Sequence, residues 1–423
     1  MHNNRLIKKH LVKLLCNILK EDNMEEKYLI INAGSSSLKF TLYEMPSAKE
    51  IVNGYIQKIG EGDSFYQLKY GDKKEVKEKD IKSHSEAVQT MLDELLDNSF
   101  INNIGEIKGV GHRVLHGGEF YSKSTLIDEE VLKNIKDLTK LGPLHHPGEI
   151  AGIEGMMEVL KDVPQVAVFD TAFHQTMPKE NYLYAVPYSW YKENGVRKYG
   201  FHGTSHNYIT QQMKKYFNKD EINLIVCHIG SGASIACIKN GVCYDTTMGL
   251  TPLDGLIMGT RSGSIDPSII EYVAREREMS VEEVIDALNK ESGLLGIAGK
   301  NDYRDLSKAN EDGDEKANLA LKMFYNSVTK FIAEYYFKLD GKVDALVFTA
   351  GIGENAKVFR KEIMERICKP MNIKLDENAN DEIPFKNREG RISTDDSAFE
   401  VLVVPTNEEY MIAKDILEIV KKD

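Results

Sequence analysis

The stretch NAGSSSLKF, residues 32–40, decides how the rest of this chain is interpreted. It follows the apolar run YLII (28–31) and leads into a second one, FTLYEM (40–45). A small polar turn between two apolar runs predicts a β-hairpin. Because glycine and serine expose backbone N–H groups and hydroxyls without side-chain bulk, such a turn suits phosphate oxygens. One turn alone is more often an ordinary hairpin than a ligand site.

The pattern occurs a second time in the middle of the chain. IINAGSSSLKFTLYE (30–44) is similar to IVCHIGSGASIACIKN (225–240), with Gly34 and Gly230 in equivalent places. This internal sequence similarity predicts two related domains, each beginning with a hairpin whose turn consists of glycine and serine. Two such turns would bind a polyphosphate from both sides.

The composition excludes several classes of protein. A chain of 423 residues is long enough for two domains or more. Its net charge of −12 argues against a nucleic-acid partner, and an anionic substrate needs a local cluster of cations. Five cysteines without a CxxC pair suit reduced thiols in the cytoplasm. No apolar run approaches the ~20 residues of a membrane span.

Short apolar runs alternate with amphipathic segments, which predicts an α/β fold. We expect strands at 28–32, 37–43, 108–114, 165–169, 223–229, 233–239, 344–349 and 400–404. We expect helices near 84–97, 128–140, 147–161, 204–217, 268–276, 280–289, 314–339, 356–367 and 407–421.

The first 23 residues differ from the rest, since RLIKKHLVKLLCNILK (5–20) is basic and has helical periodicity. Lys13 and Asn17 interrupt its apolar part and no small-residue cleavage site follows, which argues against a signal peptide. A membrane-surface helix is an alternative. We expect Met24 to be the natural start and 1–23 to be a translated leader or a non-native extension.

A third glycine turn, ALVFTAGIGENA (345–356), also fits the dinucleotide-binding pattern GxGxxA, with Asp376 at a suitable distance. A dehydrogenase interpretation rests on this turn alone. The Walker pattern GxxxxGK[ST] is absent from the sequence.

Eight of the 11 histidines lie between His112 and His228, in segments punctuated by glycine and proline. The cluster favours an active site. His202 and His206 have an i, i+4 spacing that also suits zinc, but the glutamate of HExxH is missing. The long glycine-rich loop 248–267 presents one arginine, Arg261, which would stabilise phosphoryl-transfer charge.

Seven motifs occur in an order that resembles the acetokinase family, within the actin, sugar-kinase and Hsp70-ATPase superfamily. They are NAGSSSLKF, HRVLHGGE, VFDTAFHQTMP, RKYGFHGTSH, MGLTPLDGLIMGTRSGSIDP, GIGENA and VVPTNEE. The resemblance covers the chain from Met24 onward. It implies an α/β fold of two duplicated ribonuclease-H-like (actin-like ATPase) domains with a central interdomain cleft. The expected N-terminal domain is 24–172 plus 407–423, and the nucleotide-binding domain is 173–406.

The resemblance also implies the chemistry: reversible transfer of a phosphoryl group from ATP to acetate, giving acetyl phosphate and ADP. It implies magnesium, with manganese as a substitute, and a homodimer. The expected catalytic residues are Asp170, His202 and Arg261. The expected substrate residues are Arg113, Leu115, Leu144, Phe201 and Pro252, with Arg113 on the carboxylate. The expected metal residues are Asn32 and Glu408. The expected nucleotide residues are Lys39, His228, Ile229, Gly230, Ser231, Gly232, Asp302, Tyr303, Arg304, Gly351, Ile352, Gly353, Glu354 and Asn355.

The sequence departs from the family pattern at a few positions. Ser231 stands where asparagine is usual, which predicts a weaker or water-mediated phosphate contact. His146 and Glu149 replace the usual residues of the LHNP segment. Leu115 stands where valine is common, and its larger side chain should favour acetate over propionate or butyrate.

Two rival functions follow from the same residues. A propionate or butyrate kinase would differ in the pocket around Leu115. An ATP-gated binding module, as in Hsp70-type ATPase domains, would not need Arg113 and His202.

Overall fold

The computed structural model describes residues 25–143, 145–383 and 389–421. The predicted leader (1–23) and the predicted pocket residue Leu144 lie outside the described residues. The chain forms two compact units. Unit 1 consists of the described residues of Met1–His116, Ser124–Phe169 and Glu409–Asp423, and unit 2 of Gly117–Lys123 and Asp170–Glu408. The domain boundaries expected from the resemblance stay a prediction.

Unit 1 contains an eight-stranded sheet with the order β5-β4-β3-β2-β1-β6-β8-β7. Its first five strands form an antiparallel meander, and β6 and β8 run parallel to β1. The strands are β1 (Glu26–Ala33), β2 (Ser37–Met45), β3 (Lys49–Gln57), β4 (Phe65–Tyr70), β5 (Lys73–Glu78), β6 (Ile107–Val114), β7 (Thr125–Leu126) and β8 (Gln165–Phe169).

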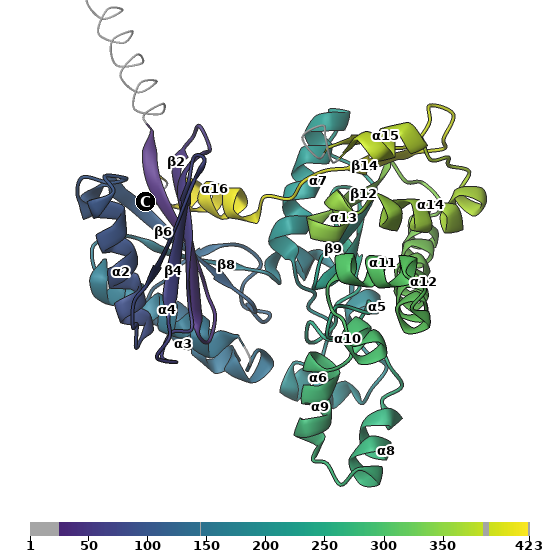
Figure 1. Ribbon diagram of the computed structural model, residues 1–423, viewed down its shortest axis with the longest axis horizontal. Helices are drawn as coiled ribbons and strands as arrows, with labels where there is room; N and C mark the ends of the chain where they lie inside the picture. Colours follow the sequence, from purple (N-terminus) through teal and green to yellow (C-terminus); the bar gives the residue numbers. More distant parts are fainter. Residues whose placement is uncertain (1–24, 144, 384–388, 422–423) are drawn as a thin grey trace, which may run out of the picture. The chain divides into compact units, whose positions relative to one another are not determined.

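Helices cover both faces of this sheet, as Figure 1 shows. Alternate residues of β1 point to opposite faces, so Leu29 and Ile31 pack with α2 (His84–Asp97) and α4 (His146–Val159). Tyr28 and Ile30 pack with α16 (Glu408–Val420). A short helix, α3 (Glu129–Asp137), precedes α4.

Unit 2 contains a six-stranded sheet with the order β11-β10-β9-β12-β14-β13. Its strands are β9 (Leu224–Ile229), β10 (Ala233–Lys239), β11 (Val242–Thr246), β12 (Ala345–Thr349), β13 (Gly390–Arg391) and β14 (Glu400–Val403). Its helices are α5 (Lys179–Tyr182), α6 (Tyr188–Asn194), α7 (Gly203–Phe217), α8 (Ser268–Glu276), α9 (Val281–Lys290), α10 (Gly293–Ala298), α11 (Tyr303–Glu311), α12 (Glu315–Lys338), α13 (Ala350–Asn355), α14 (Lys357–Met371) and α15 (Glu377–Glu382).

The two sheets share a topology. In each sheet, three consecutive strands are each antiparallel to the next: β1–β3 in unit 1 and β9–β11 in unit 2. Two further strands, parallel to the first of the three, continue the sheet on its other side: β6 and β8 in unit 1, and β12 and β14 in unit 2. The predicted α/β fold with a duplicated core is therefore confirmed. The strands β3, β4, β5 and β11 were not predicted, nor were the short edge strands β7 and β13.

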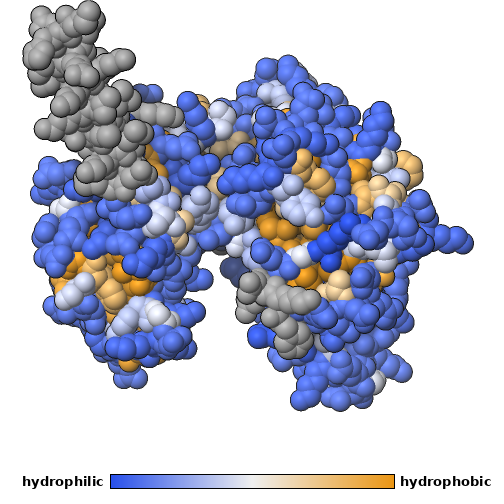
Figure 2. Space-filling model, turned by 90° about the horizontal axis from the view of Figure 1, so that it is seen from above, coloured by the Kyte–Doolittle hydropathy of each residue, from blue (hydrophilic) through white to orange (hydrophobic). Residues whose placement is uncertain are grey.

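The face shown in Figure 2 is mostly hydrophilic, with separate apolar patches. Among the described residues, no helix has both the length and the apolar character that a membrane span requires.

Candidate active site

Both sheets present predicted site residues at the carboxyl ends of their parallel strands, where ligands of α/β sheets usually bind. In unit 1, Asn32 lies near the end of β1 and Arg113 near the end of β6, and both are half-buried. Lys39 is exposed on β2 and pairs with Asn32 in the antiparallel register. The structure therefore brings the predicted magnesium and substrate residues of unit 1 to one edge of its sheet.

The glycine turn of unit 1 is closed on itself and packed against two helices. The N–H of Gly34 donates to the carbonyl of Ser37 at 2.8 Å, and Nε2 of His84 lies 2.8 Å from the Gly34 carbonyl oxygen. Gly148 of α4 approaches so closely that an added Cβ would lie 2.3 Å from the carbonyl carbon of Gly34. The backbone of this turn is thus held by α2 and α4.

The atypical residues His146 and Glu149 lie at the start of α4 in unit 1. Both are buried, and the Glu149 carboxylate accepts from the N–H of Leu115 at 3.1 and 3.2 Å. Nδ1 of His146 donates to the Ile135 carbonyl at 3.0 Å, and burial lowers the pKa of this imidazole. Glu149 therefore positions the backbone of Leu115, whose side chain is itself buried, and His146 joins α4 to α3.

Unit 2 contains a cavity of about 780 Å³ beside its own glycine turn. The predicted nucleotide residues that line it come from the β9–β10 turn, from the start of α11 and from α13: Gly230, Ser231, Asp302, Tyr303, Arg304, Gly351, Ile352 and Asn355. Five lining residues were not predicted: Asn301, Ser307, Ala356, Lys357 and Val358. They adjoin the predicted motifs along the chain, so a wider window around NDYRD and GIGENA would have included them.

The other predicted nucleotide residues of unit 2 do not line this cavity. Ile229 and His228 are buried at the end of β9, and Gly232 and Gly353 lie next to lining residues. The Glu354 carboxylate accepts from the N–H groups of Ala350 at 2.8 Å and Thr406 at 3.1 Å. Glu354 thus joins the segments that follow β12 and β14, and it supports α13, which lines the cavity.

At the mouth of the cavity, Asp302 caps α11 by accepting from the Arg304 N–H at 2.8 Å. The Arg304 guanidinium also donates to both carboxylate oxygens, at 3.0 and 2.7 Å, which lowers the pKa of Asp302 to about 2. The hydroxyl of Tyr303 lies 2.9 Å from that of Tyr325 in the interior, so its ring supports the cavity wall.

The glycine-rich loop 248–267 brings Arg261 to the turn of unit 2. The N–H of Gly259 donates to the Ser231 carbonyl at 3.0 Å, which ties the loop to the turn. Arg261 Nη1 donates to the carbonyl of Pro252 at 3.3 Å, and burial lowers the pKa of the guanidinium. No carboxylate of the described residues forms an ion pair with Arg261, so this cation is available to an anionic ligand.

His202 lies over the same turn in a strained backbone conformation. It has φ 56° and ψ 26°, the left-handed region that non-glycine residues rarely adopt and that clusters at active sites. The next residue, Gly203, donates its N–H to the Asp170 carbonyl at 2.9 Å, and a Cβ there would lie 2.2 Å from that oxygen. This close approach links the predicted catalytic residues Asp170 and His202 through their backbones.

His202 and Arg261 converge on one point. A Cβ built on Gly232 would lie 3.6 Å from His202 Nε2 and 3.8 Å from Arg261 Nη1. The geometry therefore places two donors above a backbone turn that borders the cavity. Phe201, which precedes His202, is buried, and its carbonyl accepts from His174.

A buried polar network around His202 was not predicted. The Ser234 hydroxyl lies 2.9 Å from His202 Nδ1 and 2.8 Å from His206 Nε2. The rings of His202 and His228 stack, with centroids 4.2 Å apart. Ser205 Oγ lies 2.7 Å from His228 Nδ1. Ser234 belongs to the run SGAS, which is typical of a turn, so the sequence did not distinguish it from its neighbours.

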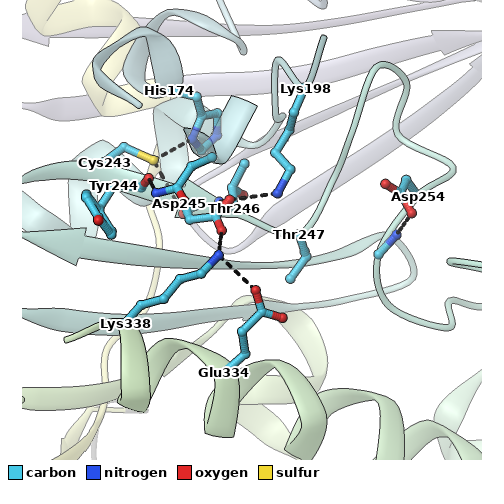
Figure 3. A network of polar contacts seen from close by, with 12 residues as sticks. His174, Lys198, Cys243, Tyr244, Asp245, Thr246, Thr247, Asp254, Glu334 and Lys338 are labelled. Atoms are coloured by element: carbon cyan, nitrogen blue, oxygen red, sulfur yellow. Dashed lines mark hydrogen bonds and ion pairs between the residues drawn. The ribbon is translucent and has the colours of Figure 1, made fainter. Parts of the chain in front are cut away.

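A second buried network anchors β11, the strand beside β10 (Figure 3). The fully buried Asp245 carboxylate accepts from Lys198 at 2.7 Å and from Lys338, which also pairs with Glu334 at 2.9 Å. Because both lysines lie on other segments of unit 2, Asp245 joins the sheet to α12 and to the chain before α7. Its position within the core indicates a structural role.

The donor set of the predicted metal residues fits magnesium by its chemistry. Asn32 and Glu408 supply oxygen atoms, and magnesium is commonly held by one or two carboxylates together with substrate phosphates. Within residues 25–143, 145–383 and 389–421, no group of three histidine, cysteine, aspartate or glutamate side chains could hold a metal ion. Both His202 and His206 are engaged by Ser234, which argues against the zinc interpretation.

Comparisons with known proteins identify the family of this chain. The family model described as the acetokinase family matches residues 27–414. An acetate kinase of Geobacillus sp. (strain WCH70) is 47% identical over 396 residues, which cover 93% of this chain and 98% of that protein.

Two solved structures are also similar over 93% of this chain. The acetate kinase of Porphyromonas gingivalis has 40% identity and a TM-score of 0.88, with 100% of that chain covered. A propionate kinase of Francisella tularensis subsp. tularensis SCHU S4 has 42% identity and a TM-score of 0.88, with 99% of that chain covered. The chain belongs to the acetokinase family.

Proposed function

We propose that this chain is an acetate kinase that uses Arg261 and His202 to stabilise the phosphoryl group in transit between ATP and acetate. The membership of the family and the acetate kinases similar over nearly the whole chain support the reaction. One observation carries the residue assignment: a half-buried arginine without an ion pair among the described residues and a histidine nitrogen converge over Gly232.

The chemistry requires cations more than it requires a base. A simple carboxylic acid has a pKa near that of glutamate, ~4.3, so acetate is ionised at neutral pH. The difficulty is to bring this anion to a triphosphate and to hold the two in line. Arg113 binds the carboxylate, and Arg261 and His202 donate to the oxygens of the transferring phosphoryl group. Asp170 orients these groups and does not remove a proton.

The nucleotide binds in the cavity of unit 2. Its phosphates lie along the turn Gly230–Gly232, and Asp302, Arg304 and Gly351 contribute the walls. Lys39 adds a contact to ATP. Asn32 and Glu408 hold magnesium, for which manganese substitutes. The metal, when bound, neutralises charge on the phosphate oxygens.

Acetate is the preferred acid because Leu115 occupies more volume than valine. Glu149 holds the Leu115 backbone. Phe201 and Pro252 are the other apolar residues that we assign to the acid. The similarity to a propionate kinase makes propionate the second candidate substrate. The protein is expected to act as a cytoplasmic homodimer without nucleic acid or membrane, and sedimentation of the purified protein tests the dimer.

The decisive experiment is to trap acyl phosphates with hydroxylamine after incubation with ATP-Mg and acetate, propionate or butyrate. We expect the strongest signal with acetate. A stronger signal with propionate or butyrate would retain the kinase and refute the pocket assignment. Intact ATP binding without acyl phosphate from any acid would favour the ATP-gated binding module.

A further inference from the structure

The His202 ring contacts a buried hydroxyl that the proposed mechanism does not use. Ser234 is fully buried on β10, and its Oγ lies between His202 Nδ1, at 2.9 Å, and His206 Nε2, at 2.8 Å. A hydroxyl has one proton, so it can donate to only one of these two nitrogens. The direction of this donation decides which nitrogen of His202 carries a proton.

Hydrogen bonds link His202, Ser234 and His206 in a row, and the protonation of His206 sets the direction in which Ser234 donates. His206 is fully buried, and its Nδ1 has no hydrogen-bond partner in the described part of the protein. Burial lowers the pKa of His206 well below 6.5, so the ring is neutral and carries one proton. A buried N–H without an acceptor is rarer than a buried acceptor without a donor. The proton therefore lies on Nε2, which donates to Ser234 Oγ.

Among the described residues, Ser234 Oγ has no hydrogen-bond partner besides these two nitrogens, so its own proton is donated to His202 Nδ1. Nδ1 cannot carry a proton in this arrangement, so His202 carries its proton on Nε2. This is the nitrogen that lies 3.6 Å from the Cβ position of Gly232, next to Arg261 Nη1. In the opposite arrangement a nitrogen lone pair would face the phosphoryl oxygens and repel them.

We propose that Ser234 and His206 are positioning residues that hold His202 as the Nε2–H tautomer, so that a neutral imidazole donates to the transferring phosphoryl group. This inference rests on the proposed function for its purpose, although the tautomer itself is a property of the protein alone. Neither residue contacts the substrate in this proposal.

The tautomer can be measured without any substrate. Long-range ¹H–¹⁵N correlation spectra of protein labelled with ¹⁵N-histidine distinguish Nδ1–H from Nε2–H, and the signal that is missing in His202→Gln identifies His202. We expect wild-type His202 to be the Nε2–H form. An Nδ1–H form would overturn the proposal, whether or not the protein makes acetyl phosphate. Absent acetyl phosphate with an Nε2–H form would instead refute only the proposed function.

Variants then test whether the hydroxyl sets the tautomer. In Ser234→Ala we expect a mixture of both His202 tautomers, with kcat lowered about tenfold and the KM for ATP and acetate nearly unchanged. Ser234→Thr retains a hydroxyl and should restore both the tautomer and kcat. Thr210→Val is a matched control, because Thr210 is a buried hydroxyl of α7 that donates to the His206 carbonyl and to no ring nitrogen.

Two results would contradict the role of Ser234. One is an unchanged tautomer and kcat in Ser234→Ala. The other is an equal loss of kcat in Thr210→Val, which would point to general damage of the core. If Ser234→Ala does not fold, His206→Leu removes the donor at the other end and should produce the same mixture of tautomers.

Discussion

The glycine turns of the two units occupy equivalent places in their sheets and have different surroundings. In unit 1, Gly34 is packed against the backbone of α4 and bonded to His84 of α2. In unit 2, Gly230 borders a cavity of about 780 Å³, and two side-chain donors lie over Gly232. Similar local sequences thus form a turn packed against helices in one unit and a turn beside a cavity in the other.

The difference indicates that a small-residue turn does not by itself define a ligand site, because the surroundings of the turn decide what can reach its backbone. The two turns have different neighbours. In unit 1, Gly148 of α4 lies against the backbone of Gly34, whereas in unit 2 the neighbour of the turn is expected to be a ligand. Substitutions that add one methyl group or remove one charge can therefore distinguish packing of the turn in unit 1 from ligand binding at the turn in unit 2.

The largest expected effect is on catalysis in unit 2. Arg261→Ala should lower kcat by about 10²–10³, or ~3–4 kcal/mol of transition-state stabilisation, because it removes a donor aimed at developing charge. The measurement is steady-state acetyl phosphate formation, with circular dichroism to verify folding. A near-normal kcat would exclude Arg261 from the transition state. Arg304→Ala, which removes an exposed arginine at the mouth of the cavity, is the comparison variant and should lower kcat much less.

The next effect is on stability in unit 1. Gly148→Ala would place a methyl group against the backbone of Gly34 and Ser35, which cannot move aside as a flexible side chain would. We expect the free energy of unfolding to fall by roughly 1–3 kcal/mol. Denaturant titration followed by circular dichroism measures this change. Unchanged stability would mean that α4 does not support the turn as the structure indicates.

A smaller effect is expected from the corresponding change in unit 2. A Cβ on Gly351 meets nothing within 4 Å, so Gly351→Ala should leave the denaturation midpoint unchanged. Its methyl group enters the cavity and should weaken ATP binding several-fold, about 1 kcal/mol. Calorimetric titration with ATP-Mg measures the affinity. If the stability falls and the affinity does not, the cavity is not the nucleotide site.

The smallest effect is expected at Ser231, one of the residues that depart from the family pattern. Ser231→Asn lengthens the side chain at the cavity and should strengthen nucleotide binding by less than about 1 kcal/mol, through one neutral hydrogen bond. The same titration measures it, with Ser231→Ala as the control that removes the hydroxyl. Weaker binding in Ser231→Asn than in wild type would show that the cavity is shaped for serine.

Much of the fold could be predicted from local patterns. The helix 268–276 was predicted with the bounds of α8, and 84–97 with those of α2, because both have clear apolar periodicity. Three of the five meander strands, β3, β4 and β5, were missed. β5, KKEVKE, has a single apolar residue, the exposed Val76 at the edge of the sheet, so it lacks the alternation that marks a strand.

The candidate site was predictable only in part. Motifs with glycine beside a strand identified the turn of unit 2, α13 and Arg261, because backbone approach and buried charge have recognisable sequence signals. Ser234 and Glu149 have no such signal. Their significance depends on which buried groups face them: the imidazoles of His202 and His206 for one, and the N–H of Leu115 for the other.

By itself, the sequence determined the class of fold, its internal duplication and the motifs that point to phosphoryl transfer, since these depend on periodicity, turn chemistry and residue order. Only the tertiary structure decided that the turn of unit 1 is packed against α4 while the turn of unit 2 borders a cavity. It also decided which hydroxyl contacts His202. The physical reason is that burial and hydrogen-bond direction depend on neighbours far apart in the chain, which a local pattern does not specify.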